Sequence, residues 1–204
     1  MHLEVFVEEP SAEQALRNLL PRILPIGSTS RYHTFQGKTE LLTKLPSRLR
    51  GYAHWLSAEW RVVVLVDEDR QDCCVLKERL ERAAAAAGLS TKTAPGTGRF
   101  HVLNRIAIEE LEAWFFGDVQ ALVNAYPGVP ATLAQRRGFR DPDQISGGTW
   151  EALERVLQKA GYYPGGIPKV EVAQRVSAHM DPPRNTSHSF QVFVAGVRAL
   201  AESV

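Results

Sequence analysis

The chain has 204 residues, with 24 Lys and Arg against 23 Asp and Glu, so its formal net charge is +1. This balance gives no bulk support for binding nucleic acid or another polyanion, although a local patch around a metal ion would suffice. The 44% hydrophobic and 23% charged residues are typical of a soluble globular protein with a core of useful size. The length predicts one domain, or one domain with an appendage.

The two cysteines are adjacent, at Cys73 and Cys74. Adjacent cysteines rarely bridge each other, so we expect no disulfide framework, a reducing cytoplasmic setting, and burial of both at the start of a helix. Met1 to Val7 leads directly into carboxylates, which does not resemble a signal peptide. Apolar stretches stay short of the roughly 18 to 20 residues that span a bilayer, and we expect no membrane contact.

Strands and helices alternate through the first part of the chain. Short apolar runs bounded by charge predict strands, and apolar residues at helical spacing predict helices. The expected strands are residues 3–7, 31–35, 61–66, 89–94 and 100–106. The expected helices are one capped by Ser11 that reaches Ile23, then 41–55, 75–87 and 109–116. This alternation is typical of an α/β protein with a mostly parallel sheet.

After Asp118 the pattern changes to helices joined by segments that contain Pro and Gly. The expected helices are residues 119–126, 150–160, 170–179 and 190–204. We therefore expect residues 1–118 to form the α/β core. Residues 119–204 are expected to form a helical portion packed on that core rather than an independent domain.

One apolar run, Val62 to Val66, ends abruptly in Asp67-Glu68-Asp69. Five consecutive Val and Leu residues bounded by charge predict a strand buried on both faces of a parallel sheet. Chemistry in such sheets collects just outside the carboxyl ends of the strands. Alternation along an extended backbone places Asp67 and Asp69 on the same side. Two carboxylates there predict a site for Mg²⁺ or Mn²⁺.

Two further strand ends deliver acids. Glu8 ends the first strand, and Glu13 lies about one helical turn beyond it; alone, these acids are typical of a helix N-terminus. The third group is Glu109, Glu110 and Glu112, which alone reads as a solvated helix face, although apolar neighbours crowd Glu112. Several converging carboxylates would raise each other's pKa, and a pair of divalent metal ions would relieve that repulsion.

Several stretches, taken in order, carry a family resemblance. They are Val7-Glu8 with Glu13, Gln36-Gly37-Lys38, residues 64–69 with Asp72-Cys73, residues 110–114 with Gly117-Asp118, and residues 185–190. With these motifs, nearly the whole chain resembles the bacterial domain-of-unknown-function family four-two-seven-six. Its core resembles the TOPRIM fold of topoisomerases, primases, recombination proteins and OLD-type nucleases. The resemblance implies a TOPRIM-like, mostly parallel sheet flanked by helices within residues 1–118.

The resemblance also implies roles for individual acids. Glu8 would be the TOPRIM glutamate, a metal ligand or general acid/base, and Asp67 and Asp69 would be the metal-binding pair. Glu13 and Glu112 resemble the extra acids that let OLD-type nucleases hold two metals. The expected metal ligands are therefore Glu8, Asp67, Asp69 and Glu112, with Glu13 completing the catalytic set. One departure is that Glu9-Pro10 stands where the family motif commonly has Gly, which stiffens the loop.

These features predict a Mg²⁺- or Mn²⁺-dependent phosphodiesterase that acts on DNA or RNA. The resemblance implies a setting in bacterial anti-phage defence, with an ATPase as partner. One alternative is a non-catalytic interaction module that docks an ATPase or another copy of itself. A second alternative is a phosphohydrolase for nucleotides or other small phosphates.

Several basic residues bear on these alternatives. Lys38 or Lys169 could offset charge on a bound phosphate, and a solvated lysine is the competing interpretation of Lys38. Arg136, Arg137 and Arg140 form the densest basic patch of the sequence. That patch fits either a nucleic-acid backbone contact or a solvated loop.

Overall fold

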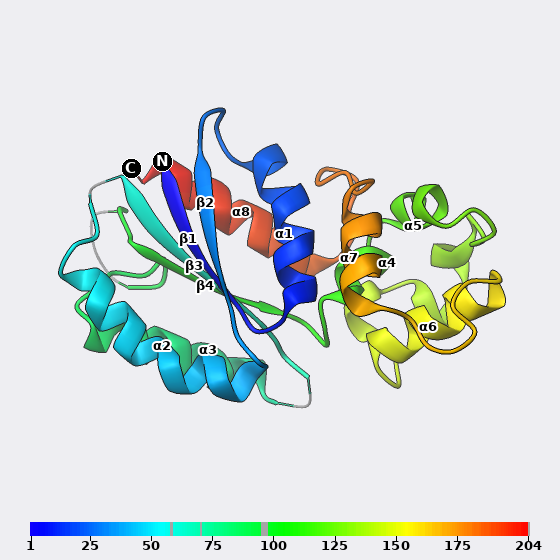
Figure 1. Ribbon diagram of the computed structural model, residues 1–204, viewed down its shortest axis with the longest axis horizontal. Helices are drawn as coiled ribbons and strands as arrows, with labels where there is room; N and C mark the ends of the chain where they lie inside the picture. The colour runs from blue at the N-terminus through cyan, green and yellow to red at the C-terminus, as the bar shows by residue number, and fades with distance from the viewer. Residues whose placement is uncertain (58, 70, 95–97, 204) are drawn as a thin grey trace.

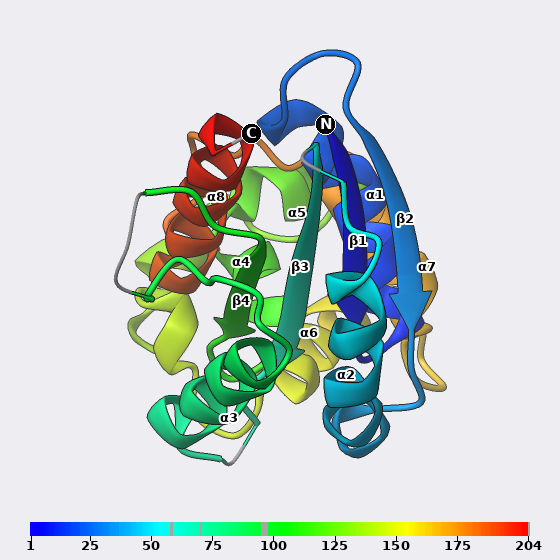
Figure 2. The ribbon, with the colours of Figure 1, turned by 90° about the vertical axis from the view of Figure 1, so that its left-hand side faces the viewer.

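The computed structural model describes residues 1–57, 59–69, 71–94 and 98–203. Within these residues four strands form one sheet in the order β2-β1-β3-β4, and every neighbouring pair is parallel. The strands are β1 His2–Val7, β2 Thr29–Thr34, β3 Trp60–Asp67 and β4 Val102–Ala107. Figure 2 shows the four strands side by side. The predicted α/β class with a parallel sheet is confirmed, and this arrangement is consistent with a TOPRIM-like fold.

Helices cover both faces of the sheet. They are α1 Pro10–Ile23, α2 Lys38–Ala53, α3 Cys73–Ala86, α4 Glu112–Phe116, α5 Val119–Ala125, α6 Thr149–Lys159, α7 Lys169–Ser177 and α8 His188–Glu202. Helices α2 and α3 lie on one face, and α1 and α8 lie on the other (Figure 1). Helices α4 to α7 gather at the end of the sheet away from the two chain termini (Figure 1), which is where the strands end.

Alternation along the strands builds two cores. On β1, Leu3 and Val5 join a core with α1 and α8, whereas Phe6 joins the core under α2 and α3. On β3, Val63 faces the first core and Val62 the second. Because the strands are covered on both faces, their continuous Val and Leu runs become fully buried. Each such side chain stabilises the fold by roughly 1.5–3 kcal/mol relative to exposure.

Two predicted elements differ in the structure. The strand predicted at 89–94 is wrong, because this segment forms only an isolated bridge between Thr91 and Val102. Its polar residues beyond Thr91 offer little apolar surface to a sheet edge. The helix predicted at 109–116 begins only at Glu112, because Glu109 has a left-handed φ of 59°, which no α-helix accommodates.

Local capping also differs from expectation. Ser11 lies inside α1, since Pro10 occupies the first helical turn and Glu9 becomes the N-cap residue. Helix α3 begins at Cys73 and is capped by the Asp72 side chain, which accepts from the backbone N–H groups of residues 74 and 75. The burial expected for both cysteines is wrong, because Cys73 is half-buried and Cys74 is exposed. The predicted C-terminal helix is present as α8, and Val204 lies outside the described residues.

The helical portion is packed on the sheet domain. Arg22 of α1 donates to the carbonyls of Met180 and Ala178, both at 2.6 Å, just beyond α7. At the other end, Arg61 of β3 donates to the carbonyl of Ser203 at 2.5 Å, which ties the end of α8 to the sheet. One apolar core runs through both portions. No helix among the described residues combines the length and apolarity needed to cross a membrane.

Candidate acidic site at the carboxyl ends of the strands

Glu8 lies directly beyond β1 and reaches across to β3. Its side chain is buried, with 6% exposure, and its Oε1 accepts a hydrogen bond from the backbone N–H of Asp67 at 2.7 Å. The contact follows from the register, because Val7 lies opposite Leu65 in the parallel β1–β3 pair. Burial raises the pKa of Glu8 to about 7, although the Asp67 N–H and the nearby Lys38 oppose the rise.

Asp67 is the residue whose pKa responds to the other carboxylates of the site. Burial, followed by the charges of Glu8, Glu112 and Asp69, raises the pKa of Asp67 well above its usual value, and Glu9 adds to the effect. These five carboxylates come from the ends of β1 and β3 and from the start of α4. The structure therefore places Glu8, Asp69 and Glu112 within electrostatic range of Asp67, and the sequence singles out all four of these residues.

Glu112 approaches from the helical side. It is 3% exposed at the first position of α4, and burial raises its pKa to about 7. Lys169, the first residue of α7, opposes that rise, and its ammonium lies 3.7 Å from Oε2 of Glu9. Although burial alone would lower the pKa of Lys169, the charges of Glu112 and Glu9 raise it. Lys169 is thus a cation shared by acids from both sides of the site.

Asp69 reaches the site by a route that alternation does not describe. Strand β3 ends at Asp67, and Asp69 has a left-handed φ of 51°. The extended backbone assumed for this placement is therefore wrong, although Asp69 still lies within electrostatic range of Asp67 and Glu8. Lys38 holds it there, because the Lys38 ammonium donates to Oδ2 of Asp69 at 2.6 Å and to the carbonyl of Glu68 at 3.0 Å.

Lys38 is buried, with 9% exposure, so the interpretation of a solvated lysine is wrong. Gly37 positions it. Gly37 caps α2 with φ 90° and ψ 170°, a conformation that is essentially restricted to glycine. The Gly37 N–H donates to the carbonyl of Glu8 at 2.9 Å. The motif Gln36-Gly37-Lys38 therefore joins the exit of β1 to the exit of β3.

Glu109 and Glu110 border a pocket beside these acids. The pocket has a volume of about 650 Å³, and its lining includes Asp69, Glu109, Glu110 and Glu151. Glu109 is tied to the β3 loop, because its carbonyl accepts from the N–H of Asp69 at 2.8 Å. Glu110 accepts from the Thr149 hydroxyl at 3.0 Å and from the backbone of residue 150 at 2.8 Å. The pocket is strongly acidic and open to a cationic or cation-bearing ligand.

Glu13 has other partners. Its Oε1 accepts from Nε of Arg17 at 2.9 Å, and its other oxygen accepts from the Thr34 hydroxyl. Although burial opposes the change, these hydrogen bonds lower the pKa of Glu13. Glu13 would have to leave Arg17 and Thr34 to join the acids around Asp67, so its predicted role stays a prediction.

The electrostatic balance at Asp67 fits a divalent cation. The lysines that counter its five carboxylates are Lys38 and Lys169, and three of the acids respond with a raised pKa. A hard cation would remove that penalty, since carboxylate oxygens are its preferred ligands. Among the described residues, the three potential ligands within 4.8 Å of one another are instead Asp72, Cys73 and Cys74. The acids around Asp67 therefore do not form a preformed set of three ligands among the described residues, and they would have to move closer together to bind one ion.

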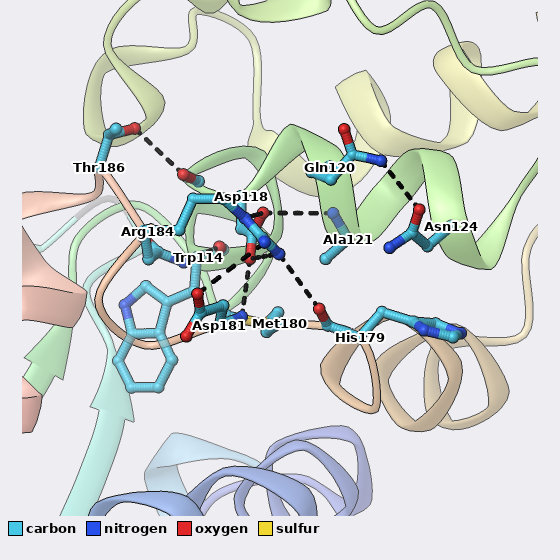
Figure 3. Close-up of polar contacts among 12 residues, drawn as sticks. Trp114, Asp118, Gln120, Ala121, Asn124, His179, Met180, Asp181, Arg184 and Thr186 are labelled. Carbon is cyan, nitrogen blue, oxygen red and sulfur yellow. Dashed lines mark hydrogen bonds and ion pairs between the residues drawn. The ribbon is translucent and has the colours of Figure 1, made fainter.

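A polar joint anchors the helix that carries Glu112. The Asp118 side chain has no exposure and accepts from Arg184 at 2.7 and 2.8 Å, and from the backbone N–H groups of Asp181 and Ala121 (Figure 3). Thr186 donates its hydroxyl to the carbonyl of Gly117 at 3.1 Å (Figure 3). These contacts lock the end of α4 to the segment before α8.

Gly117 and Asn185 pack too closely for any side chain at position 117. A Cβ on Gly117 would lie 2.1 Å from Oδ1 of Asn185. Asn185 in turn donates to the carbonyl of Trp114 at 2.7 Å. Two motifs far apart in the sequence, residues 117–118 and 185–190, therefore serve a structural purpose that supports the position of Glu112.

Sequence reasoning missed two parts of this site. It treated Glu9 only as a departure from the family motif, although Glu9 pairs with Lys169 and adds negative charge near Asp67. It also gave no sign of the pocket wall at Gly147, Gly148 and Glu151, which lie at the start of α6 and line the pocket with Glu109 and Glu110. The Gly147-Gly148 pair was the available signal, because two adjacent glycines mark a turn.

The fold and the site define a parallel α/β protein with an acidic site at the carboxyl ends of its strands. The chain belongs to the family described as domain of unknown function DUF4276, whose model matches residues 7–198. The predicted family is thereby confirmed, and the match crosses the boundary between the α/β core and the helical portion. Searches of curated proteins and of solved structures found no match for this chain.

Proposed function

We propose that this protein is a divalent-metal-dependent nuclease of TOPRIM type, which hydrolyses phosphodiester bonds in DNA or RNA. The observation that carries the proposal is the cluster of five carboxylates around Asp67, with Lys38 and Lys169 as its counter-charges. Two of these acids, Glu8 and Glu112, are buried, and their charged forms are costly without a cation, which suits Mg²⁺ or Mn²⁺. The family resemblance supports a setting in the bacterial cytoplasm, where the protein would act beside an ATPase in anti-phage defence.

In this proposal Glu8, Asp67 and Glu112 hold the cation, and Asp69 contributes if it releases Lys38. A bound divalent ion supplies an activated water and stabilises the charge on phosphoryl oxygens. Glu8 and Glu112 each have a pKa of about 7 in the metal-free protein, and a bound divalent ion would hold both as carboxylates. Lys169 lies at the border of the site, where its ammonium could pair with a substrate phosphate.

The proposal is tested by incubating the purified protein with labelled DNA and RNA pools in Mn²⁺, Mg²⁺ or EDTA. Cleavage that requires the metal and disappears in Asp67→Ala is the expected result. Asp181→Ala is the matched control, because the Asp181 side chain is exposed and is not among the charges that act on Asp67. Absence of polymer cleavage, with phosphate release from a mononucleotide, would favour a small-molecule phosphohydrolase. Absence of both, even with a neighbouring ATPase added, would favour the interaction module.

A further inference from the structure

A second pocket, of opposite charge, adjoins the acidic pocket. It has a volume of about 660 Å³ and is lined by Arg137, Arg140 and Arg155, with Asp141 as the acid among its described lining residues. Three guanidinium groups around one pocket are a marked concentration of positive charge in a chain whose net charge is only +1. We call this the arginine pocket.

Two of the three arginine side chains in this pocket have no polar partner. In the part of the chain that the structure describes, the guanidinium groups of Arg137 and Arg155 make no hydrogen bond or ion pair, and Arg140 donates Nε to the carbonyl of Gln135 at 3.2 Å. By contrast, the Arg184 side chain forms an ion pair with Asp118. Free guanidinium groups present planar forks of donors, which match the oxygens of a phosphate.

The loop that carries the arginines is held in place by its neighbours. The Phe139 ring packs against Phe116 of α4, with 5.3 Å between ring centroids. Asp143 accepts from the Ser187 hydroxyl at 2.7 Å and from the Ser189 N–H at 2.9 Å, at the start of α8. The loop is therefore packed against α4, the helix that carries Glu112, and bonded to the start of α8.

The two pockets share a wall. Ser146 lines the arginine pocket, and the next residue, Gly147, lines the acidic pocket. Likewise, Ala152 lines the arginine pocket and its neighbour Glu151 lines the acidic pocket. Along α6, Glu151 and Arg155 are about one turn, or roughly 6 Å, apart. A nucleic-acid strand rises about 3.4 Å per nucleotide, so its backbone would pass from one pocket to the other within a few nucleotides.

We propose that the arginine pocket binds backbone phosphates of a polynucleotide whose scissile phosphate lies at the acids around Asp67. The substrate is then a polymer rather than a mononucleotide, and the arginines bind it without reading its sequence. This inference rests on the proposed function for the meaning of the acidic site. The binding that it describes is measurable without any cleavage.

The test is the binding of labelled single-stranded DNA and RNA oligonucleotides in EDTA. Fluorescence anisotropy measures the affinity over a range of salt concentrations. We expect Arg137→Ala and Arg155→Ala each to weaken binding roughly 3- to 10-fold and to lower the salt slope by about 0.7–0.9. Arg79→Ala is the matched control, because Arg79 is an exposed arginine on α3, outside the arginine pocket. The affinity and the salt slope of the Arg79→Ala variant should equal those of the unmodified protein. The DNA and RNA arms identify the polymer.

If Arg137→Ala and Arg155→Ala bind the oligonucleotides as tightly as Arg79→Ala does, the inference is overturned. Weakened binding without any cleavage by the unmodified protein would support the arginine pocket and remove the proposed function. Metal-dependent cleavage whose KM is unchanged in Arg155→Ala would keep the proposed function and overturn the arginine pocket. The failure of one is thereby distinguished from the failure of the other.

Discussion

Buried carboxyl groups set the pH behaviour of the metal-free protein. The pKa of Glu112 is raised from 4.5 to about 7, so the folded state holds a proton there that the unfolded chain has released. The stability that this proton confers is fully present below about pH 4.5 and is lost as the pH rises through about 7. Glu8 behaves in the same way. Stability in EDTA should therefore fall between mildly acidic and neutral pH.

Glu112→Gln tests this directly, because the amide cannot titrate. In urea unfolding with EDTA, the decline in unfolding free energy between pH 5 and pH 7.5 should shrink by on the order of 2–3 kcal/mol. Glu13→Gln is the contrasting variant, since the pKa of Glu13 is lowered and its contribution is lost only as the pH falls. An unchanged pH dependence in Glu112→Gln would mean that Glu112 is ionised and paired in the metal-free protein.

Lys38 is a second residue with a measurable effect. Lys38→Met keeps the aliphatic stem but leaves Oδ2 of Asp69 and the Glu68 carbonyl without their donor. We expect a loss of about 1–3 kcal/mol in unfolding free energy, measured in EDTA. Lys44→Met should cost under about 0.5 kcal/mol, because the Lys44–Glu40 pair lies on the surface. Equal effects of the two variants would show that Lys38 does not brace the site.

At the scale of elements, strand exits and helix starts create the site. Gly37→Ala places a side chain at φ 90°, so the start of α2 must strain or shift, at a cost of about 1–3 kcal/mol. Gly51→Ala is the matched control, because Gly51 lies in the same helix with open space around its Cα. That change should stabilise by up to about 1 kcal/mol. Thermal unfolding of both variants measures the difference, and a neutral Gly37→Ala would contradict the role given to Gly37.

The same scale shows what sequence reasoning can predict. The apolar run from Val62 to Val66 is long, uniform and sharply bounded, so it predicted β3 and the position of Asp67 correctly. The segment 89–94 lies beside the edge strand β4, but it is largely polar beyond Leu89 and pairs there only through the bridge between Thr91 and Val102. The left-handed turns at Asp69 and Glu109 are set by hydrogen bonds between two loops, which no local pattern reveals.

At the scale of the whole molecule, helices beyond the ends of the strands complete the site. Glu112 and Lys169 come from α4 and α7, and the Asp118 joint connects that group to the segment before α8 (Figure 3). The sequence predicted that residues 119–204 pack on the core, but it did not predict that Lys169 would lie beside Glu9 and Glu112. That contribution depends on contacts between residues more than a hundred positions apart, such as Glu9 and Lys169.

Asp118→Ala should therefore affect both stability and activity. It leaves two backbone N–H groups and the Arg184 guanidinium without their acceptor, which costs on the order of 2–4 kcal/mol. Cleavage should fall as well, because Glu112 loses its fixed position. Asp181→Ala should leave both nearly unchanged, since its 3.9 Å ion pair with Arg184 is exposed. Denaturant unfolding and the cleavage assay are the two measurements, and full activity in a destabilised Asp118→Ala would separate the joint from the site.

A metal ion among Glu8, Asp67 and Glu112 is the point on which the proposed chemistry depends. Anomalous diffraction from crystals soaked in Mn²⁺ measures it directly. The expected result is one or two manganese peaks in contact with Asp67, absent from crystals of Asp67→Ala. A peak confined to Asp72, Cys73 and Cys74, or no peak at saturating Mn²⁺, would contradict the assignment of these acids as the metal site.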